Sequence, residues 1–149
     1  MNDGSAPRPA IVVSACLLGV RCNHRGEASP SEAVTALCET HRVIGICPET
    51  AGGLPTPRPA AELQRDGRVV TAAGDDVTDA YQRGAAAAVA VATGAGAKQA
   101  VLKARSPSCG CRQVYDGTFT RTLRDGEGVT ARALREAGVD VVSEEELGA

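Results

Sequence analysis

The chain has 149 residues, of which 43% are apolar and 23% charged, so its composition is close to that of globular proteins and predicts one domain over residues 1–149. Sixteen Lys and Arg against 18 Asp and Glu give a net charge of −2, which provides no basic field for nucleic acid or an anionic membrane. With two Tyr, one Phe and no Trp, base stacking on an aromatic platform is also disfavoured.

The amino end, residues 1–8, is a polar segment that we expect to be a flexible tail. It lacks the features of a secretory signal, and no apolar run approaches the roughly 18 residues of a membrane span. We therefore expect a cytoplasmic protein without membrane contact. In that reducing compartment its cysteines are expected to be metal ligands, nucleophiles or buried thiols rather than disulfides. The six cysteines are Cys16, Cys22, Cys38, Cys47, Cys109 and Cys111.

The first half of the chain is predicted to alternate strand, helix and strand. Residues 10–16 form an apolar, β-branched run between Pro and Gly, which is typical of a buried parallel strand. The segment 29–32 supplies an N-cap, a Pro and a Glu, and this capping box predicts a short helix over 33–41. Residues 42–48 form a second apolar run that ends at a proline. The Gly- and Pro-rich segment 51–59 predicts a loop.

The second half continues the alternation. Residues 68–71 predict a minor strand, and a long Ala-rich helix over 75–93 is expected to lie close against the sheet. A third main strand follows at 99–103, and a helix over 129–137 precedes a last strand at 139–142. This order predicts a single-domain, three-layer α/β fold with a mostly parallel, Rossmann-like sheet.

Three cysteines, Cys16, Cys47 and Cys109, stand where predicted strands end. Parallel α/β sheets bind ligands outside the carboxyl ends of their strands, so the fold would bring these cysteines together. They lie 31 (47 − 16) and 62 (109 − 47) residues apart, too far for a local ferredoxin-like or zinc-ribbon motif. Any one of them could be a small buried apolar residue, whereas three at equivalent positions favour a shared site.

The segments that carry these cysteines resemble the signature segments of the DUF523 family, whose members include the stand-alone thiouracil desulfidases. They are Ser-Ala-Cys-Leu-Leu-Gly at 14–19, Cys-Pro-Glu with Gly-Gly-Leu and Pro-Arg within 47–58, and Lys-Ala-Arg-Ser-Pro-Ser-Cys-Gly at 103–110. The likeness extends to 115–119 and 126–130, and so covers nearly the whole chain.

The resemblance implies a [4Fe-4S] cluster held by three cysteine ligands, Cys16, Cys47 and Cys109, with a fourth iron that binds the sulfur of a thiolated nucleobase. It also implies that Glu49 and Ser106 are catalytic. We expect a non-redox reaction in which 2-thiouracil or 4-thiouracil and water give uracil and hydrogen sulfide. Glu49 would activate the water that attacks the ring carbon, and Ser106 would orient the substrate or relay a proton. The expected partners are this thiolated pyrimidine and the cluster-assembly machinery.

Four further residues are expected beside this site. Ser14 and Ser108 are interpreted as supporting positions, although Ser108 could simply stabilise a turn around a proline. Cys22 matches a position often occupied by cysteine in the family and is expected to be structural or a free thiol nearby. Cys111 departs from the usual small residue after the third segment, and a cysteine there could reach the cluster and close its open iron.

Some polar residues have two interpretations each. Arg58 and Glu62, in the Pro-rich loop, either form an ion pair that fixes the loop or line the pocket. His24 is either a proton carrier or a solvated surface group. Cys38, on a predicted helix, is expected to belong to the core.

Two other functions stay open at this point. One is a zinc-binding structural or interaction module, in which four cysteines form a closed tetrahedral site, drawn from Cys16, Cys22, Cys47, Cys109 and Cys111. The other is an iron–sulfur enzyme that acts on another thiolated nucleoside. Bound metal distinguishes the first alternative, and a panel of thiolated substrates distinguishes the second.

Overall fold

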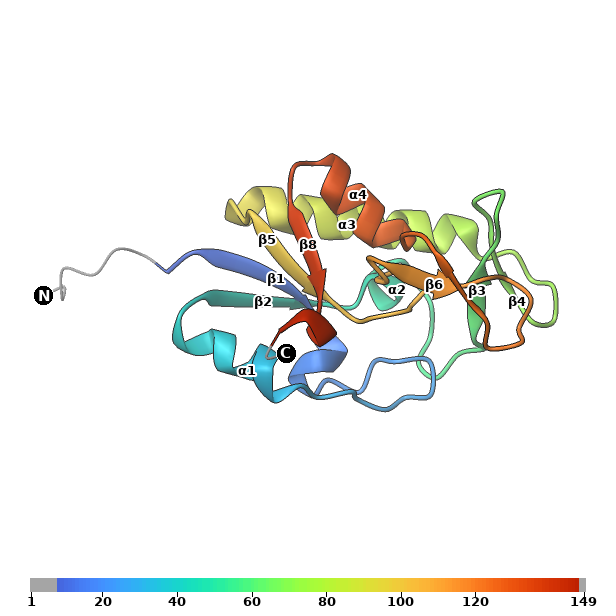
Figure 1. Cartoon of the computed structure of the whole chain (residues 1–149), viewed down its shortest axis with the longest axis horizontal. Helices are drawn as coiled ribbons and strands as arrows, with labels where there is room; N and C mark the ends of the chain where they lie inside the picture. The colour runs from blue at the N-terminus through green and yellow to red at the C-terminus, as the bar shows by residue number, and fades with distance from the viewer. Residues whose placement is uncertain (1–7, 148–149) are drawn as a thin grey trace, which may run out of the picture.

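A four-stranded parallel sheet flanked by helices forms the centre of the computed structural model, which describes residues 8–147 (Figure 1). All neighbouring strands are parallel, and they lie in the order β2-β1-β5-β8. The strands are β1 (Ala10–Ser14), β2 (Arg42–Ile46), β5 (Gln99–Leu102) and β8 (Asp140–Ser143). The predicted α/β fold with a parallel sheet is therefore confirmed.

The strand order reverses between β1 and β5. The chain leaves β1 to form β2 on one side, and then returns past β1 to form β5 on the other side. In open parallel sheets such a reversal opens a crevice at the carboxyl ends of the two strands. The loops that leave β1, β2 and β5 carry Cys16, Cys47 and Cys109 respectively.

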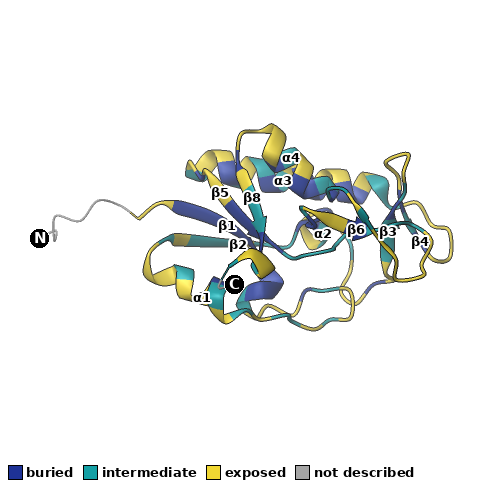
Figure 2. Ribbon diagram, in the orientation of Figure 1, coloured by how far each residue is buried: buried dark blue, intermediate teal, exposed yellow. Residues whose placement is uncertain are grey.

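Helices cover both faces of the sheet (Figures 1 and 2). On one face, α3 (Thr78–Ala95) and α4 (Val129–Glu136) pack against the sheet through a core that includes Val12, Leu102, Ala88, Ala92 and Leu134. On the other face, the short α1 (Glu32–Ala36) and the 3₁₀ turn Ala15–Leu18 pack through Ile11, Val13, Leu17, Val34 and Val101. The inner face of α3 is rich in alanine, which lets its backbone approach the strands closely.

Two antiparallel hairpins extend the molecule beyond the carboxyl edge of the sheet. They are formed by β3 (Ala61–Leu63) with β4 (Val69–Thr71), and by β6 (Gln113–Tyr115) with β7 (Leu123–Asp125). The sequence predicted only β4 among these strands. β4 consists of β-branched residues that favour a strand, whereas β3, β6 and β7 lack such a run, so their pairing partners decide their structure.

Several element boundaries differ from the prediction. β1 ends at Ser14, and Cys16 lies in a 3₁₀ turn closed by Gly19, whose φ of 97° is the left-handed conformation that favours glycine. α3 starts at Thr78 rather than at 75, because the Asp76 carboxylate accepts a hydrogen bond from the Thr78 amide at 2.9 Å while Asp76 bridges to β4. The short α2 (Pro48–Ala51), capped by Cys47, was not predicted.

Three further expectations concern the amino end, Cys38 and contact with a membrane. Most of the predicted tail, residues 1–7, lies outside the described residues. Arg8 is exposed and donates a hydrogen bond to the Cys38 carbonyl at 2.7 Å. Cys38 is itself exposed, so its predicted core position is wrong: the helix there ends in a 3₁₀ turn (Leu37–Glu39) that turns it to solvent. Among residues 8–147, no helix combines the length and the apolar character that crossing a membrane would need.

Two glycines set how closely α2 approaches α3. A Cβ atom added to Gly52 would lie 1.9 Å from the carbonyl oxygen of Ala80, and one added to Gly84 would lie 1.9 Å from the carbonyl oxygen of Pro48. The two helices therefore touch through their backbones. This contact fixes the position of α2, and with it the loop that follows β2.

Replacing either glycine with alanine should force the two helices apart. We expect Gly52→Ala and Gly84→Ala each to lower the free energy of unfolding by about 1–3 kcal/mol, measured by urea denaturation. Gly94 is the matched control, because it also lies in α3 but has no atom within 4 Å of an added Cβ. Gly94→Ala should stabilise the protein by up to about 1 kcal/mol. Unchanged stability in both crossing variants would contradict the close backbone contact.

Candidate active site

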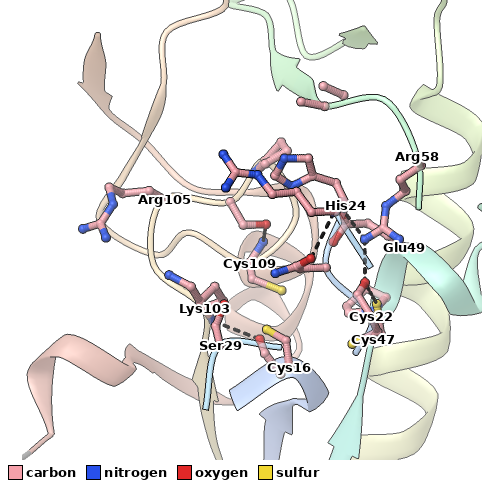
Figure 3. A pocket seen from close by; sticks show the side chains of 18 of the residues that line it. Cys16, Cys22, His24, Ser29, Cys47, Glu49, Arg58, Lys103, Arg105 and Cys109 are labelled. Carbon is pink, nitrogen blue, oxygen red and sulfur yellow. Dashed lines mark hydrogen bonds and ion pairs between the residues drawn. The ribbon is translucent and has the colours of Figure 1, made fainter. Parts of the chain in front are cut away.

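A cavity of about 540 Å³ opens at the carboxyl edge of the sheet (Figure 3). Its walls come from the ends of β1 and β2, from α2, from the segment 58–62 and from the loop after β5. The loop segment 22–29, Tyr81 of α3, and Tyr115 and Arg121 of the β6–β7 hairpin also contribute to the lining. The cavity thus lies at the reversal of strand order, where a ligand crevice is expected.

Four thiols line this cavity (Figure 3). Cys16, Cys22 and Cys109 are buried, and Cys47 is half-buried. Burial raises the pKa of Cys16 to about 11 and the pKa of Cys109 to about 12. Because a metal binds the thiolate, a metal that enters here must displace protons from these thiols. The three cysteines predicted as ligands are thus brought together, although they come from three separate loops.

Cys22 lies beside Cys47 and is the fourth thiol of the cavity. The Cys47 thiol donates to the Cys22 carbonyl at 3.5 Å, and the Thr50 hydroxyl donates to the Cys47 sulfur at 3.2 Å. Burial and the neighbouring Cys47 raise the pKa of Cys22 to about 12. The expectation that Cys22 lies near the site agrees with this placement.

Glu49 lies in the first turn of α2, with its side chain 15% exposed, and it lines the cavity. Its Oε2 atom accepts a hydrogen bond from the Tyr81 hydroxyl at 3.0 Å and pairs with Arg58 Nη2 at 3.3 Å. Burial, followed by the Glu49 carboxylate, raises the pKa of Tyr81, so its phenol stays protonated and donates. Tyr81 was not singled out from the sequence; a lone aromatic residue in an Ala-rich helix was the available signal.

The predicted ion pair between Arg58 and Glu62 is wrong. The Arg58 side chain turns instead towards Glu49, and the Glu62 carboxylate accepts hydrogen bonds from the amides of Gly117 at 3.0 Å and Phe119 at 3.1 Å. Glu62 therefore ties β3 to the β6–β7 hairpin. Both residues line the cavity, as the other interpretation predicted.

Ser106 lines the cavity and organises the turn that carries Cys109. Its Oγ atom accepts hydrogen bonds from the amides of Ser108 and Cys109, both at 3.0 Å. A hydroxyl has two lone pairs and one hydrogen, so these two bonds occupy its acceptor sites. The hydroxyl hydrogen of Ser106 is the part that can serve a ligand.

The remaining predicted positions, Ser14, Ser108 and Cys111, lie in three different surroundings. Ser14 lines the cavity, and its hydroxyl accepts a hydrogen bond from the Lys103 amide at 2.9 Å, which joins the ends of β1 and β5. Ser108 is fully buried behind the cavity wall, where its hydroxyl shares a hydrogen bond of 2.8 Å with Thr130 of α4. Cys111 lines a separate hollow of about 150 Å³, beside Glu146, and not the cavity of the other thiols.

The C-terminal 3₁₀ turn (Glu144–Glu146) holds the loop after β5 in place. Glu144 accepts from the Ala104 amide at 2.8 Å and pairs with Lys103 Nζ at 3.1 Å.

His24 belongs to another part of the cavity lining. Partial burial lowers the pKa of His24, which favours its neutral form at pH 7. His24 is exposed to solvent and also lines the cavity, so both interpretations of this residue stay open.

Fold and cavity together define an α/β protein with a site of buried thiols and a held carboxylate at the carboxyl edge of a parallel sheet. The 2-thiouracil desulfurase family matches residues 11–146 of the chain, and the protein belongs to this family. The similarity to DUF523 is thereby confirmed.

Two similar proteins cover almost the whole chain. The uncharacterized protein YbbK of Bacillus subtilis (strain 168) is 41% identical over 146 residues, which cover 92% of this chain and 97% of YbbK. A solved structure of the [4Fe-4S]-dependent thiouracil desulfidase TudS is 44% identical, covers 94% of this chain and 93% of TudS, and superposes with a TM-score of 0.88. The family match over residues 11–146 includes every residue that lines the cavity.

The buried pair Ser108–Thr130 gives a stability prediction. Ser108→Ala should lower the free energy of unfolding by about 1–3 kcal/mol, because it leaves the Thr130 hydroxyl buried without its partner. The double variant Ser108→Ala/Thr130→Val removes both polar groups and should recover part of this loss in a urea titration. A double variant that loses the sum of both single effects would show that the two hydroxyls do not depend on each other.

Proposed function

We propose that this protein removes sulfur from a thiolated pyrimidine by hydrolysis and uses a [4Fe-4S] cluster to do so: 2-thiouracil or 4-thiouracil and water give uracil and hydrogen sulfide. The observation that carries the proposal is the convergence of Cys16, Cys47, Cys109 and Glu49 on one cavity. Membership in the 2-thiouracil desulfurase family and the likeness to TudS support the substrate class and the cofactor.

The donor set of the cavity fits an iron–sulfur cluster. Thiolates are the preferred ligands of such clusters, and each thiolate binds a different iron. Thiols that approach from three loops suit a larger group with several metal positions. We assign Cys16, Cys47 and Cys109 as its ligands, which leaves one of four irons without a protein ligand.

The protein residues around the substrate have separate tasks. When bound between Cys16, Cys47 and Cys109, the cluster would supply a Lewis acid that polarises the thiocarbonyl group and makes the ring carbon more electrophilic. Glu49 accepts a proton from the water that attacks this carbon. Its Oε2 atom accepts a hydrogen bond from Tyr81 and lies 3.3 Å from Arg58 Nη2, and among the described residues no hydrogen bond reaches Oε1. Oε1 is therefore the atom that receives the proton.

Ser106 acts as a hydrogen-bond donor. Because its Oγ atom already accepts from two amides, it has no free lone pair with which to take a proton from water. Of the two roles expected for Ser106, orientation of the substrate is favoured over a proton relay. Its hydroxyl hydrogen can bind an oxygen or a ring nitrogen of the pyrimidine.

A cytoplasmic setting is part of this proposal, and the state of the thiols supports it. The six cysteines are free, as a reducing compartment such as the cytoplasm would keep them. The cluster would be delivered there by cluster-assembly machinery. The family match over residues 11–146 supports one domain that carries out the whole reaction.

Metal content tests the ligand assignment. Wild-type protein purified without oxygen should contain about four irons per chain, and each ligand variant should lose most of this iron. The ligand variants are Cys16→Ser, Cys47→Ser and Cys109→Ser. Cys38→Ser and Cys111→Ser are the controls, because Cys38 is exposed and Cys111 lies outside the cavity, and both should keep their iron. Stoichiometric zinc without iron in the wild type would instead indicate a structural metal module.

Sulfide release tests the role of Glu49. Glu49→Gln keeps the size of the side chain, so it should retain the iron and the brown absorbance of the cluster. It should slow sulfide release from 2-thiouracil and 4-thiouracil by roughly 10²- to 10⁴-fold, since an amide cannot take the proton of water. A Gln variant as active as the wild type would remove Glu49 from this role. A wild type with four irons that is inert towards both compounds would point to another thiolated nucleoside.

A further inference from the structure

Two side chains from different parts of the chain hold the same oxygen of Glu49. Tyr81, in the first turns of α3, donates to Oε2 at 3.0 Å. Arg58, in the Pro-rich segment after α2, pairs with Oε2 at 3.3 Å. A carboxylate that is bound on one oxygen by a hydrogen bond and an ion pair cannot rotate without breaking both contacts.

We propose that Tyr81 and Arg58 are positioning residues that fix the Glu49 carboxylate through Oε2 and so aim Oε1 at the attacking water. This inference rests on the proposed role of Glu49 as the base. Neither residue needs to touch the substrate for this task. Their contribution is to restrict the carboxylate to the orientation in which the proton transfer can occur.

The contacts of Arg58 are those of a fixed side chain. Its side chain is only 4% exposed, and its guanidinium also donates to the carbonyls of Cys22 at 2.9 Å and Pro55 at 3.2 Å. Its Nε atom is buried without a hydrogen-bond partner. An unpaired buried N–H destabilises a fold, and a buried ion pair is a weak source of stability. The arrangement is therefore better explained by the geometry it imposes on Glu49 than by stability.

Tyr81 is fixed in a different way. It is 3% exposed, and it packs in the small core formed by Leu63, Val69 and Val114. Its helix also meets α2 through the backbone contact at Gly84, one turn further along. The hydroxyl and the carboxylate thus belong to two helices whose separation is set by their backbones. Since burial raises the pKa of Tyr81, the phenol remains a donor.

Another residue already attaches α2 to α3, so the contacts to Glu49 are not needed for that structural role. Arg83, also on α3, donates to the Gly52 carbonyl through Nε at 3.1 Å and Nη2 at 3.0 Å. It binds the same short helix from the same neighbouring helix without reaching Glu49. Arg83 is therefore a matched control that separates helix attachment from carboxylate orientation.

The main experiment compares Tyr81→Phe with Arg83→Met in the iron-loaded enzyme. Tyr81→Phe removes one hydroxyl and keeps the ring, so iron content and KM should be unchanged, while kcat for sulfide release should fall roughly 10- to 100-fold. Arg58→Lys, which keeps the charge but loses the planar fork, should also lower kcat more than it changes KM. Arg83→Met should keep the wild-type kcat.

Two kinetic results would overturn the inference without touching the proposed function. One is a wild-type kcat in both Tyr81→Phe and Arg58→Lys. The other is an equal loss of kcat in Arg83→Met, which would show that any loosening of α2 has this effect.

A crystal structure of Tyr81→Phe provides a second, independent test. We expect the Glu49 carboxylate to rotate away from its wild-type orientation, and an unchanged orientation would overturn the inference. If the wild type loads iron but releases no sulfide from thiouracil, the proposed function fails. The crystal structures then still decide whether Tyr81 positions Glu49.

Discussion

The reversal of strand order between β1 and β5 is the constraint on which the site depends. It places the ends of three neighbouring parallel strands, β2, β1 and β5, at one edge of the sheet, and each strand continues into a loop that carries one of the three cysteines. The hydrogen bond from the Lys103 amide to the Ser14 hydroxyl joins the two strands at the point of reversal. Cys16 and Cys109, 93 (109 − 16) residues apart, become neighbours through this topology alone.

Burial of the thiols links the fold to its cofactor. The buried Cys16, Cys22 and Cys109 all have raised pKa values, so the protein without a metal holds neutral thiols that pack as small apolar groups. A cationic iron centre reverses this preference, because it binds the thiolates and displaces their protons. The same cavity can thus be stable before the cofactor arrives and can bind it afterwards, and its affinity for the metal increases with pH.

The sequence predicted those parts of the site that depend on local pattern. Apolar runs identify strands, and a cysteine after each run follows from reading along the chain, so Cys16, Cys47 and Cys109 could be grouped before the fold was known. Tyr81 and the partner of Arg58 could not be predicted in this way. Tyr81 meets Glu49 across 32 residues, and it does so because two glycines allow α2 and α3 to touch. A contact between two helices that depends on glycines, which have no side chain, leaves no periodic pattern in the sequence.

Glu49 and Ser106 are held in the same way: the protein binds some atoms of the functional group and leaves another atom available for the reaction. Glu49 is held by Oε2 and has Oε1 available, whereas Ser106 is held through its lone pairs and has its hydrogen available. These restraints come from a helix, from the buried Arg58 side chain and from backbone amides, so little reorganisation is needed when the substrate binds. Such an arrangement selects the chemistry of each group: a carboxylate held in this way can take a proton, and a hydroxyl held in this way can only donate one. The division of roles between Glu49 and Ser106 is therefore set by which of their atoms the fold has already used.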